Sequence, residues 1–176
     1  CGSGCVLVRT LALVVSGGTE QNTVRVSRGT AIQTAVRRPD LVRRAVNKFR
    51  KDGLTATAKV IKDRIERTTA LGYSSAGVVI ETGNGVEDFV PGDILACSGQ
   101  GFASHAQFVS VPRRLLARVP AGVEPYEAAF GTLGAIAMQG VRLGRVELGE
   151  NVAVIGLGLI GQITVQLLSA AGCRVF

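Results

Sequence analysis

The stretch VAVIGLGLIGQ, residues 152–162, decides how this chain is read. Its first four residues predict a short buried strand, and three spaced glycines follow, Gly156, Gly158 and Gly161. The next residues, 159–171, are compatible with a helix. In this order the first glycine permits a tight turn, the second lets the backbone approach a pyrophosphate, and the third lets the helix pack closely on its strand. An ordinary strand–helix turn is the alternative. We predict a dinucleotide site whose helix N-terminus faces the phosphates, formed by Gly156, Gly158, Leu159, Ile160 and Gly161.

The same region has a second interpretation, because no charged residue occurs from Asn151 to Cys173, a length that could cross a bilayer. Polar residues recur at helical spacing after Gly161, which favours a helix with one half-exposed face over a membrane span. The other half of a dinucleotide site is an acidic residue about 20 residues further on. The sequence ends at Phe176, where a second strand has only begun, so we expect the chain to be a fragment. NAD and NADP cannot be distinguished without that acidic position.

Composition restricts the class of protein. A hydrophobic content of 47% in 176 residues is sufficient for a core. The four cysteines are scattered and form no CxxC motif, which argues against a disulfide-rich or zinc-ribbon fold and favours a reducing cytoplasm. The apolar run from Cys5 to Val15 is interrupted by Arg9, so it does not resemble a signal peptide.

The net charge of +7 is concentrated in one stretch. Residues 25–67 carry thirteen Lys and Arg against four Asp and Glu, and the rest of the chain is slightly acidic. Apolar spacing predicts one helix after Asp40 that ends at Gly53, and a second helix over about 55–67. The simpler interpretation is a solvated helical pair, and the alternative is a site for an anionic partner. The stretch is poor in aromatic residues, which argues against nucleic acid.

The remaining chain up to Pro120 is rich in strands. We expect strands over 6–15, 76–82, 94–97 and 106–111, whose short lengths and Gly, Pro and Asp punctuation predict a compact, partly open barrel. A helical connection is predicted over 125–141. The predicted organisation is a β-rich domain over 1–120 with a helical insertion at about 30–68. A linker helix and the start of a dinucleotide-binding domain follow over 121–176.

The order of five motifs resembles the medium-chain dehydrogenase/reductase family of zinc-type alcohol and polyol dehydrogenase relatives. The motifs cover most of the chain: VSGGTE (15–20), LGYSSAGVVIETGNGV (71–86), FVPGDIL (89–95), HAQFVSVP (105–112) and LGENVAVIGLGLIGQ (148–162). The nearest resemblance is to zinc-free bacterial members linked to sugar metabolism. The resemblance implies a GroES-like barrel with the basic two-helix insertion, followed by the first βα unit of a Rossmann-type α/β domain.

Departures from the family pattern concern the metal. Where zinc-dependent members place their first ligand, this chain has Gly17, and where they have Gly-His-Glu it has Gly72-Tyr73-Ser74. The third ligand position falls near Gly131 or Thr132. These residues do not supply the S, N and O set that zinc needs, and the four-cysteine structural lobe is absent. We therefore expect no metal site.

Without zinc, hydrogen-bond donors must polarise a carbonyl. The resemblance places Tyr73 and Thr19 at positions where family members carry catalytic residues. Glu20 could orient the turn that contains Thr19. The alternative for Tyr73 is an aromatic ring that fills the vanished metal site. His105 is expected to be structural, and Cys97 to be a small buried hydrophobe.

Together these features predict an NAD- or NADP-dependent, zinc-free oxidoreductase. It would transfer a hydride between nicotinamide and an alcohol or carbonyl compound, with a sugar-related small molecule as the substrate. We expect a cytoplasmic protein without a membrane partner, and a homo-oligomer stays open. The alternatives are a non-catalytic binding module whose basic helices hold an anionic partner, and a fragment without activity.

Overall fold

The computed structural model describes residues 1–18, 20–21 and 70–176. The chain divides into two compact units, one formed by Cys1–Ser16 with Ala70–Phe176 and the other by Gly17–Thr69. The two predicted basic helices and Thr19 lie outside the described residues. In the second unit, the described residues around position 19 are helical: Gly17, Gly18, Glu20 and Gln21.

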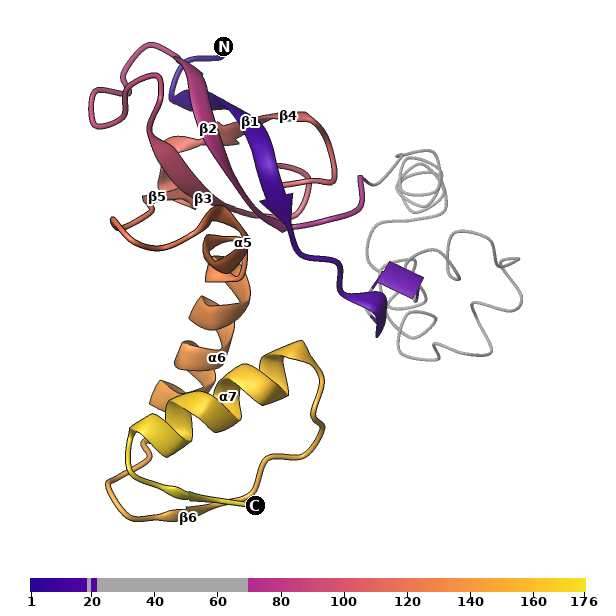
Figure 1. Ribbon diagram of the computed structural model, residues 1–176, viewed down its shortest axis with the longest axis vertical. Coiled ribbons are helices and arrows are strands. Elements are labelled where there is room, and N and C mark those ends of the chain that lie inside the picture. The colour runs from indigo at the N-terminus through magenta and orange to yellow at the C-terminus, as the bar shows by residue number, and fades with distance from the viewer. Residues whose placement is uncertain (19, 22–69) are drawn as a thin grey trace, which may run out of the picture. The chain divides into compact units, whose positions relative to one another are not determined.

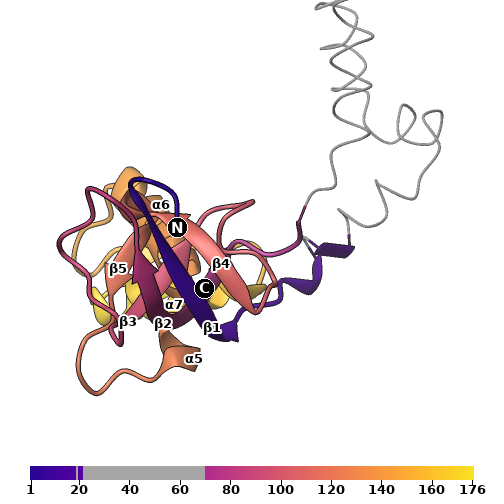
Figure 2. The same ribbon diagram turned by 90° about the horizontal axis from the view of Figure 1, so that it is seen from above.

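The first unit contains a five-stranded antiparallel sheet with the order β4-β1-β2-β3-β5 (Figures 1 and 2). Its strands are β1 (Cys5–Leu13), β2 (Ser74–Thr82), β3 (Ile94–Ser98), β4 (Phe108–Pro112) and β5 (Leu116–Arg118). The four strands predicted from sequence are confirmed, with their ends moved by up to two residues. The prediction missed β5, which is only three residues long and follows a 3-10 turn over Arg113–Leu115.

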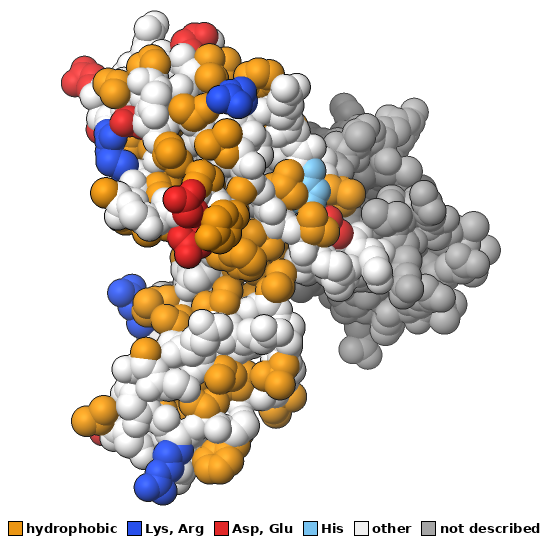
Figure 3. Space-filling view, viewed as in Figure 1, with side chains coloured by type: hydrophobic (Ala, Val, Ile, Leu, Met, Phe, Trp, Pro, Cys, Tyr) orange, Lys and Arg blue, Asp and Glu red, His pale blue; other side chains and the backbone are white. Residues whose placement is uncertain are grey.

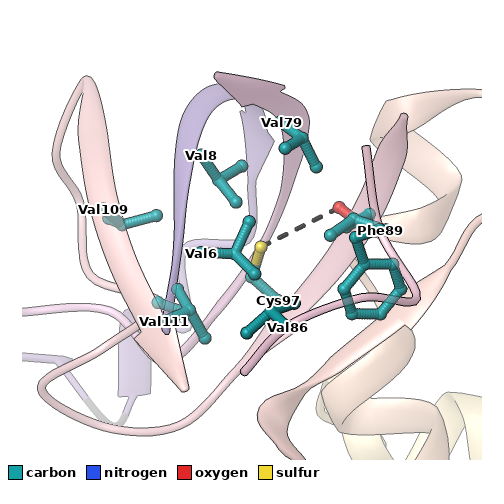
Figure 4. Close-up of a cluster of buried hydrophobic side chains, with 10 residues drawn as sticks. Val6, Val8, Val79, Val86, Phe89, Cys97, Val109 and Val111 are labelled. Atoms are coloured by element: carbon teal, nitrogen blue, oxygen red, sulfur yellow. Dashed lines mark hydrogen bonds between the residues drawn. The ribbon is translucent and has the colours of Figure 1, made fainter. Parts of the chain in front are cut away.

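One face of this sheet is the hydrophobic core. Side chains of β1 alternate, so that Val6 and Val8 are fully buried while their neighbours are partly or wholly exposed. Figure 4 shows these valines converging with the side chains of β2, β3, β4 and the connection between β2 and β3. Cys97 lies among them at 1% exposure, with its thiol 3.9 Å from the carbonyl oxygen of Leu95. Burial raises the pKa of the Cys97 thiol to about 12, so the prediction of a buried, apolar cysteine is confirmed.

The connection between β2 and β3 is fastened to β5 by Arg118. Its guanidinium forms an ion pair with Asp93, donates to the backbone carbonyl of Asp88 at 2.7 Å and lies 5.7 Å from the ring centre of Phe89. A second ion pair joins Asp88 to Arg113 at 2.7 Å. This connection is therefore fixed by charged contacts outside and by Phe89 inside the core.

Two helices follow the sheet where the sequence predicted one. Helix α5 (Pro125–Ala128) begins with a capping box between Glu124 and Glu127 and with proline in its first turn. Helix α6 (Gly131–Gly144) begins after Phe130 and ends at Arg145, which adopts a left-handed conformation. Both helices pack against the end of the sheet through Ala128, Ala129 and Leu133.

The C-terminal part is a βαβ unit. Strands β6 (Asn151–Val152) and β7 (Arg174–Val175) are parallel, and helix α7 (Leu159–Ala170) connects them. The predicted strand–glycine loop–helix order is confirmed, but the prediction of a buried strand is wrong, because Ile155 is fully exposed. In the described part of the chain β6 pairs with β7 alone, so these apolar side chains have no second layer to cover them.

The uncharged stretch from Asn151 to Cys173 contains strand β6 and one helix, α7, which is 12 residues long. Among the described residues, none of the helices has the length and apolar character that a membrane span requires.

Candidate functional site

The glycine loop before α7 has the backbone that the sequence predicts. Gly156 has a φ of +97°, a conformation that residues with a side chain rarely adopt. A Cβ at Gly161 would meet the carbonyl oxygen of Gly156, so the first turn of the helix packs directly on the loop. A Cβ at Gly158 would have no protein atom within 4 Å. The loop is therefore tight at its first and third glycines and open at its second, as a pyrophosphate cradle requires.

The side chains of Leu159 and Ile160 directly follow the open position at Gly158. Gly158 is the N-cap of α7, and Leu159 begins the helix and packs on the hydrophobic cluster below. Ile160 is 40% exposed. The backbone N–H groups of a helix's first turn have no acceptor within the helix, and they carry its positive dipole end. The residues present thus fit the phosphates of a dinucleotide.

Tyr73 packs on the same cluster as the start of α7. The buried members of the cluster come from the sheet end, α5 and α6: Val14, Ala76, Ala128, Ala129 and Leu133. Tyr73, Leu159 and Ile163 are partly buried against them. Figure 3 shows hydrophobic side chains gathered where the sheet meets the helices. The structure therefore places Tyr73, a predicted catalytic residue, and the first turns of α7 on one hydrophobic cluster.

Hydroxyl groups surround the backbone of Tyr73. Ser74 is buried and donates to the carbonyl oxygen of Ala129 at 2.5 Å. Thr132 donates to the Ser98 hydroxyl at 2.9 Å, and its Oγ1 is also 3.4 Å from the Tyr73 carbonyl oxygen. That carbonyl accepts the Gly99 N–H at 2.9 Å. The sequence singled out Thr132 only as a lost ligand position, and it missed Ser98.

His105 has a packing role at the start of this segment. Its backbone N–H donates to the Leu71 carbonyl at 2.8 Å, and its ring Nε2 lies 3.4 Å from the Val14 carbonyl oxygen. Gly72, with a φ of +91°, passes beneath the ring, and a Cβ there would lie 2.7 Å from Nε2. His105 thus joins the end of β1 to the chain that enters β2, in line with the structural role expected for it.

The other predicted site residues belong to the second unit. Thr19 lies outside the described residues, and Glu20 is half-buried in a helical turn. Both stay predictions. Of the positions at which the resemblance implies zinc ligands in other family members, Thr132 contacts the backbone of Tyr73 in the first unit, and Gly17 belongs to the second. The described residues hold no group of three or more His, Cys, Asp or Glu side chains that could bind a metal ion.

Comparison with solved structures defines the class of fold. The chain is similar to an alcohol dehydrogenase superfamily protein from Novosphingobium aromaticivorans, with a TM-score of 0.63 and 24% identity over 99% of this chain and 45% of that one. It is also similar to Escherichia coli quinone oxidoreductase complexed with NADPH, with a TM-score of 0.62 and 17% identity over 99% of this chain and 44% of that one.

Curated sequences point to the same family, although no protein-family model matches the chain. D-guloside 3-dehydrogenase of Escherichia coli is 37% identical over 106 residues, which are 60% of this chain and 30% of the relative. (R,R)-butanediol dehydrogenase of Bacillus subtilis is 29% identical over 125 residues, 58% of this chain and 36% of the relative. The chain is therefore related to the medium-chain dehydrogenase/reductase family, as its motifs predicted. The alignments span about a third of the length of these curated relatives.

Proposed function

We propose that this chain is part of an NAD(P)-dependent oxidoreductase that acts on an alcohol or carbonyl compound. The observation that carries this proposal is the open position at Gly158, which stands at the N-terminus of α7 in a βαβ unit and close to the cluster that holds Tyr73. The dehydrogenase names of the curated relatives support it.

The architecture that goes with this function is a GroES-like catalytic domain over residues 1–120, with a helical insertion at about 30–68. Residues 121–176 would be the linker helix and the first part of a Rossmann-type domain. The antiparallel sheet and the parallel βαβ unit with its glycine loop support this division.

The cofactor would be NAD or NADP, and its nicotinamide would give or take the hydride. In this proposal Gly156 turns the chain, Gly158 leaves room for the pyrophosphate, and Gly161 lets α7 approach the loop. The N–H groups of Leu159 and Ile160 would donate to the phosphates.

The reacting oxygen would be polarised by hydrogen bonds instead of zinc. Tyr73 is our proposed donor, and Thr19 and Glu20 are further catalytic residues that we propose from the sequence resemblance alone. The residues at the three ligand positions support a zinc-free site, since Gly17, Tyr73 and Thr132 include no cysteine, histidine or carboxylate. A sugar-related substrate is supported by the similarity to D-guloside 3-dehydrogenase.

Nucleotide binding and turnover test this function on the purified full-length protein. We expect saturable quenching of NADH or NADPH fluorescence, and nucleotide reduction with (R,R)-butanediol or a D-guloside as the probe. Absence of both binding and turnover would refute the oxidoreductase.

Elemental analysis tests the zinc-free site separately. After dialysis we expect zinc well below one atom per chain, because the ligand positions hold no thiolate, imidazole or carboxylate. One zinc per chain that is lost together with activity on treatment with a chelator would contradict the proposal.

A further inference from the structure

Three hydroxyl-bearing residues from different elements meet at one end of the sheet. Tyr73 immediately precedes β2, Ser98 is the last residue of β3, and Thr132 is in the first turn of α6. Strand register places Ser98 opposite Ser74, and Thr132 is within hydrogen-bond distance of both Ser98 and the Tyr73 carbonyl. The Ser98–Thr132 pair therefore lies directly beside the backbone of the residue proposed to polarise the substrate.

The direction of the hydrogen bonds determines what this pair can offer. Thr132 has one hydroxyl proton, and its contact with the Ser98 oxygen, 2.9 Å, is shorter than that with the Tyr73 carbonyl, 3.4 Å. The Tyr73 carbonyl already accepts the Gly99 N–H. The shorter contact assigns the Thr132 proton to Ser98, and the structure records no acceptor for the Ser98 proton among the described residues. Ser98 is an oriented donor whose own lone pair is satisfied.

Exposure distinguishes this pair from the neighbouring serine. Ser74 is 1% exposed and its hydroxyl donates to the Ala129 carbonyl oxygen, so its hydrogen bond is internal to the fold. Ser98 and Thr132 are only half-buried. Ser98 therefore lies outside the fully buried core that encloses Ser74.

We propose that Ser98 donates a hydrogen bond to the reacting oxygen of an alcohol or carbonyl substrate, and that Thr132 is the positioning residue that orients it. This inference rests on the proposed oxidoreductase function. A donor already held by a second hydroxyl stabilises negative charge that develops on a carbonyl oxygen, since it needs no reorientation during the reaction. Tyr73 and Ser98 together would replace the polarising role that zinc has in metal-dependent relatives.

The test compares four variants of the full-length protein. Ser98→Ala removes the donor, Thr132→Val removes the orienting hydroxyl at constant shape, Thr132→Ser keeps it, and Ser110→Ala is the control at an exposed serine of β4. Turnover is measured with (R,R)-butanediol and a D-guloside as probes, alongside the Kd for NADH and NADPH and the Tm.

We expect Ser98→Ala to lower kcat by about a hundredfold with little change in KM, because the donor acts mainly in the transition state. Thr132→Val should lower kcat in the same direction, and Thr132→Ser should restore most of it. Nucleotide Kd should be unchanged in all four variants, and Ser110→Ala should match the unmodified protein throughout.

Three results would overturn this inference. Full kcat in Ser98→Ala would show that Ser98 is not the donor. An equal loss of kcat in Thr132→Ser and Thr132→Val would show that Thr132 acts through packing. Loss of nucleotide binding in Ser98→Ala would also point to a structural role. An active unmodified protein with an unaffected Ser98→Ala variant refutes this inference alone, whereas an unmodified protein without nucleotide binding or turnover refutes the proposed function with it.

Discussion

The three glycines of the loop before α7 differ in what a side chain would meet. At Gly156 the obstacle is the positive φ, and at Gly161 it is the carbonyl oxygen of Gly156. At Gly158 the backbone is extended, with a φ of −73°, and a Cβ would touch no protein atom. Only at Gly158 can a substitution remove ligand binding while the fold is left intact.

Gly158→Val is therefore expected to abolish NAD(P)H binding without lowering the Tm, because the branched side chain would occupy the space of the pyrophosphate. The matched control is Gly140→Val, since Gly140 lies in α6 and a Cβ there also meets nothing within 4 Å. Fluorescence titration should show normal nucleotide affinity in the control. Unchanged affinity in Gly158→Val would refute the nucleotide site at this loop.

Tyr73 is the second residue whose chemistry can be separated from its packing. Tyr73→Phe keeps the ring against the cluster of Val14, Ala129 and Leu133 and removes only the phenol. Loss of one preorganised donor costs about 3 kcal/mol, or roughly a hundredfold in kcat. We expect that loss with an unchanged Tm. Full activity in steady-state assays would assign Tyr73 to filling space, the alternative that its sequence position leaves open.

At the level of elements, alternation and punctuation predicted most of the first unit. The buried Val6 and Val8 of β1 and the turn at Pro91–Gly92 before β3 are local signals, and the strands they predict are present. The Ser98–Thr132 pair could not be predicted, because it depends on which strand residue faces which helix turn. The exposure of Ile155 was equally invisible, since burial depends on neighbours and an apolar run carries no information about them.

The connection between β2 and β3 gives a test at this scale. The pKa of the Asp93 carboxyl is held below its ordinary value of 3.8 by the Val90 N–H, which donates at 2.9 Å, and by Arg118. A carboxyl with a lowered folded pKa contributes stability above its unfolded pKa, and this contribution is lost as the pH falls through the folded value. The contacts of Asp93 should therefore weaken only in strong acid.

Arg118→Gln should raise the Asp93 pKa toward 3.8 without reaching it, because the Val90 N–H bond remains. Side-chain NMR titration of Asp93 measures this shift directly. Arg114→Gln, at an exposed arginine one residue into the 3-10 turn, is the control and should leave the titration unchanged. Equal shifts in both variants would mean that general charge, and not the Arg118 contact, lowers the pKa.

For the whole molecule, the uneven distribution of charge offers a test that distinguishes an enzyme from a binding module. Residues 25–67 hold thirteen of the 20 Lys and Arg, and all of them lie outside the part of the chain that the structure describes. The predicted oxidoreductase site uses none of these charges. At physiological ionic strength salt largely screens exposed charges that are more than about 8 Å apart, and this distance shortens as salt rises, so an anion bound by these charges would bind more weakly.

Simultaneous replacement of Arg43, Arg44 and Lys48 by glutamine tests this distinction. If the stretch is a solvated face, the triple variant keeps its kcat and KM with (R,R)-butanediol or a D-guloside, and salt affects both proteins equally. If the stretch grips an anionic substrate, KM rises and its dependence on salt flattens. A binding module would instead show no turnover and a salt-sensitive affinity for heparin that the triple variant loses. We expect the first result, because the proposed chemistry is assigned to Tyr73 and to the loop before α7, neither of which belongs to the basic stretch.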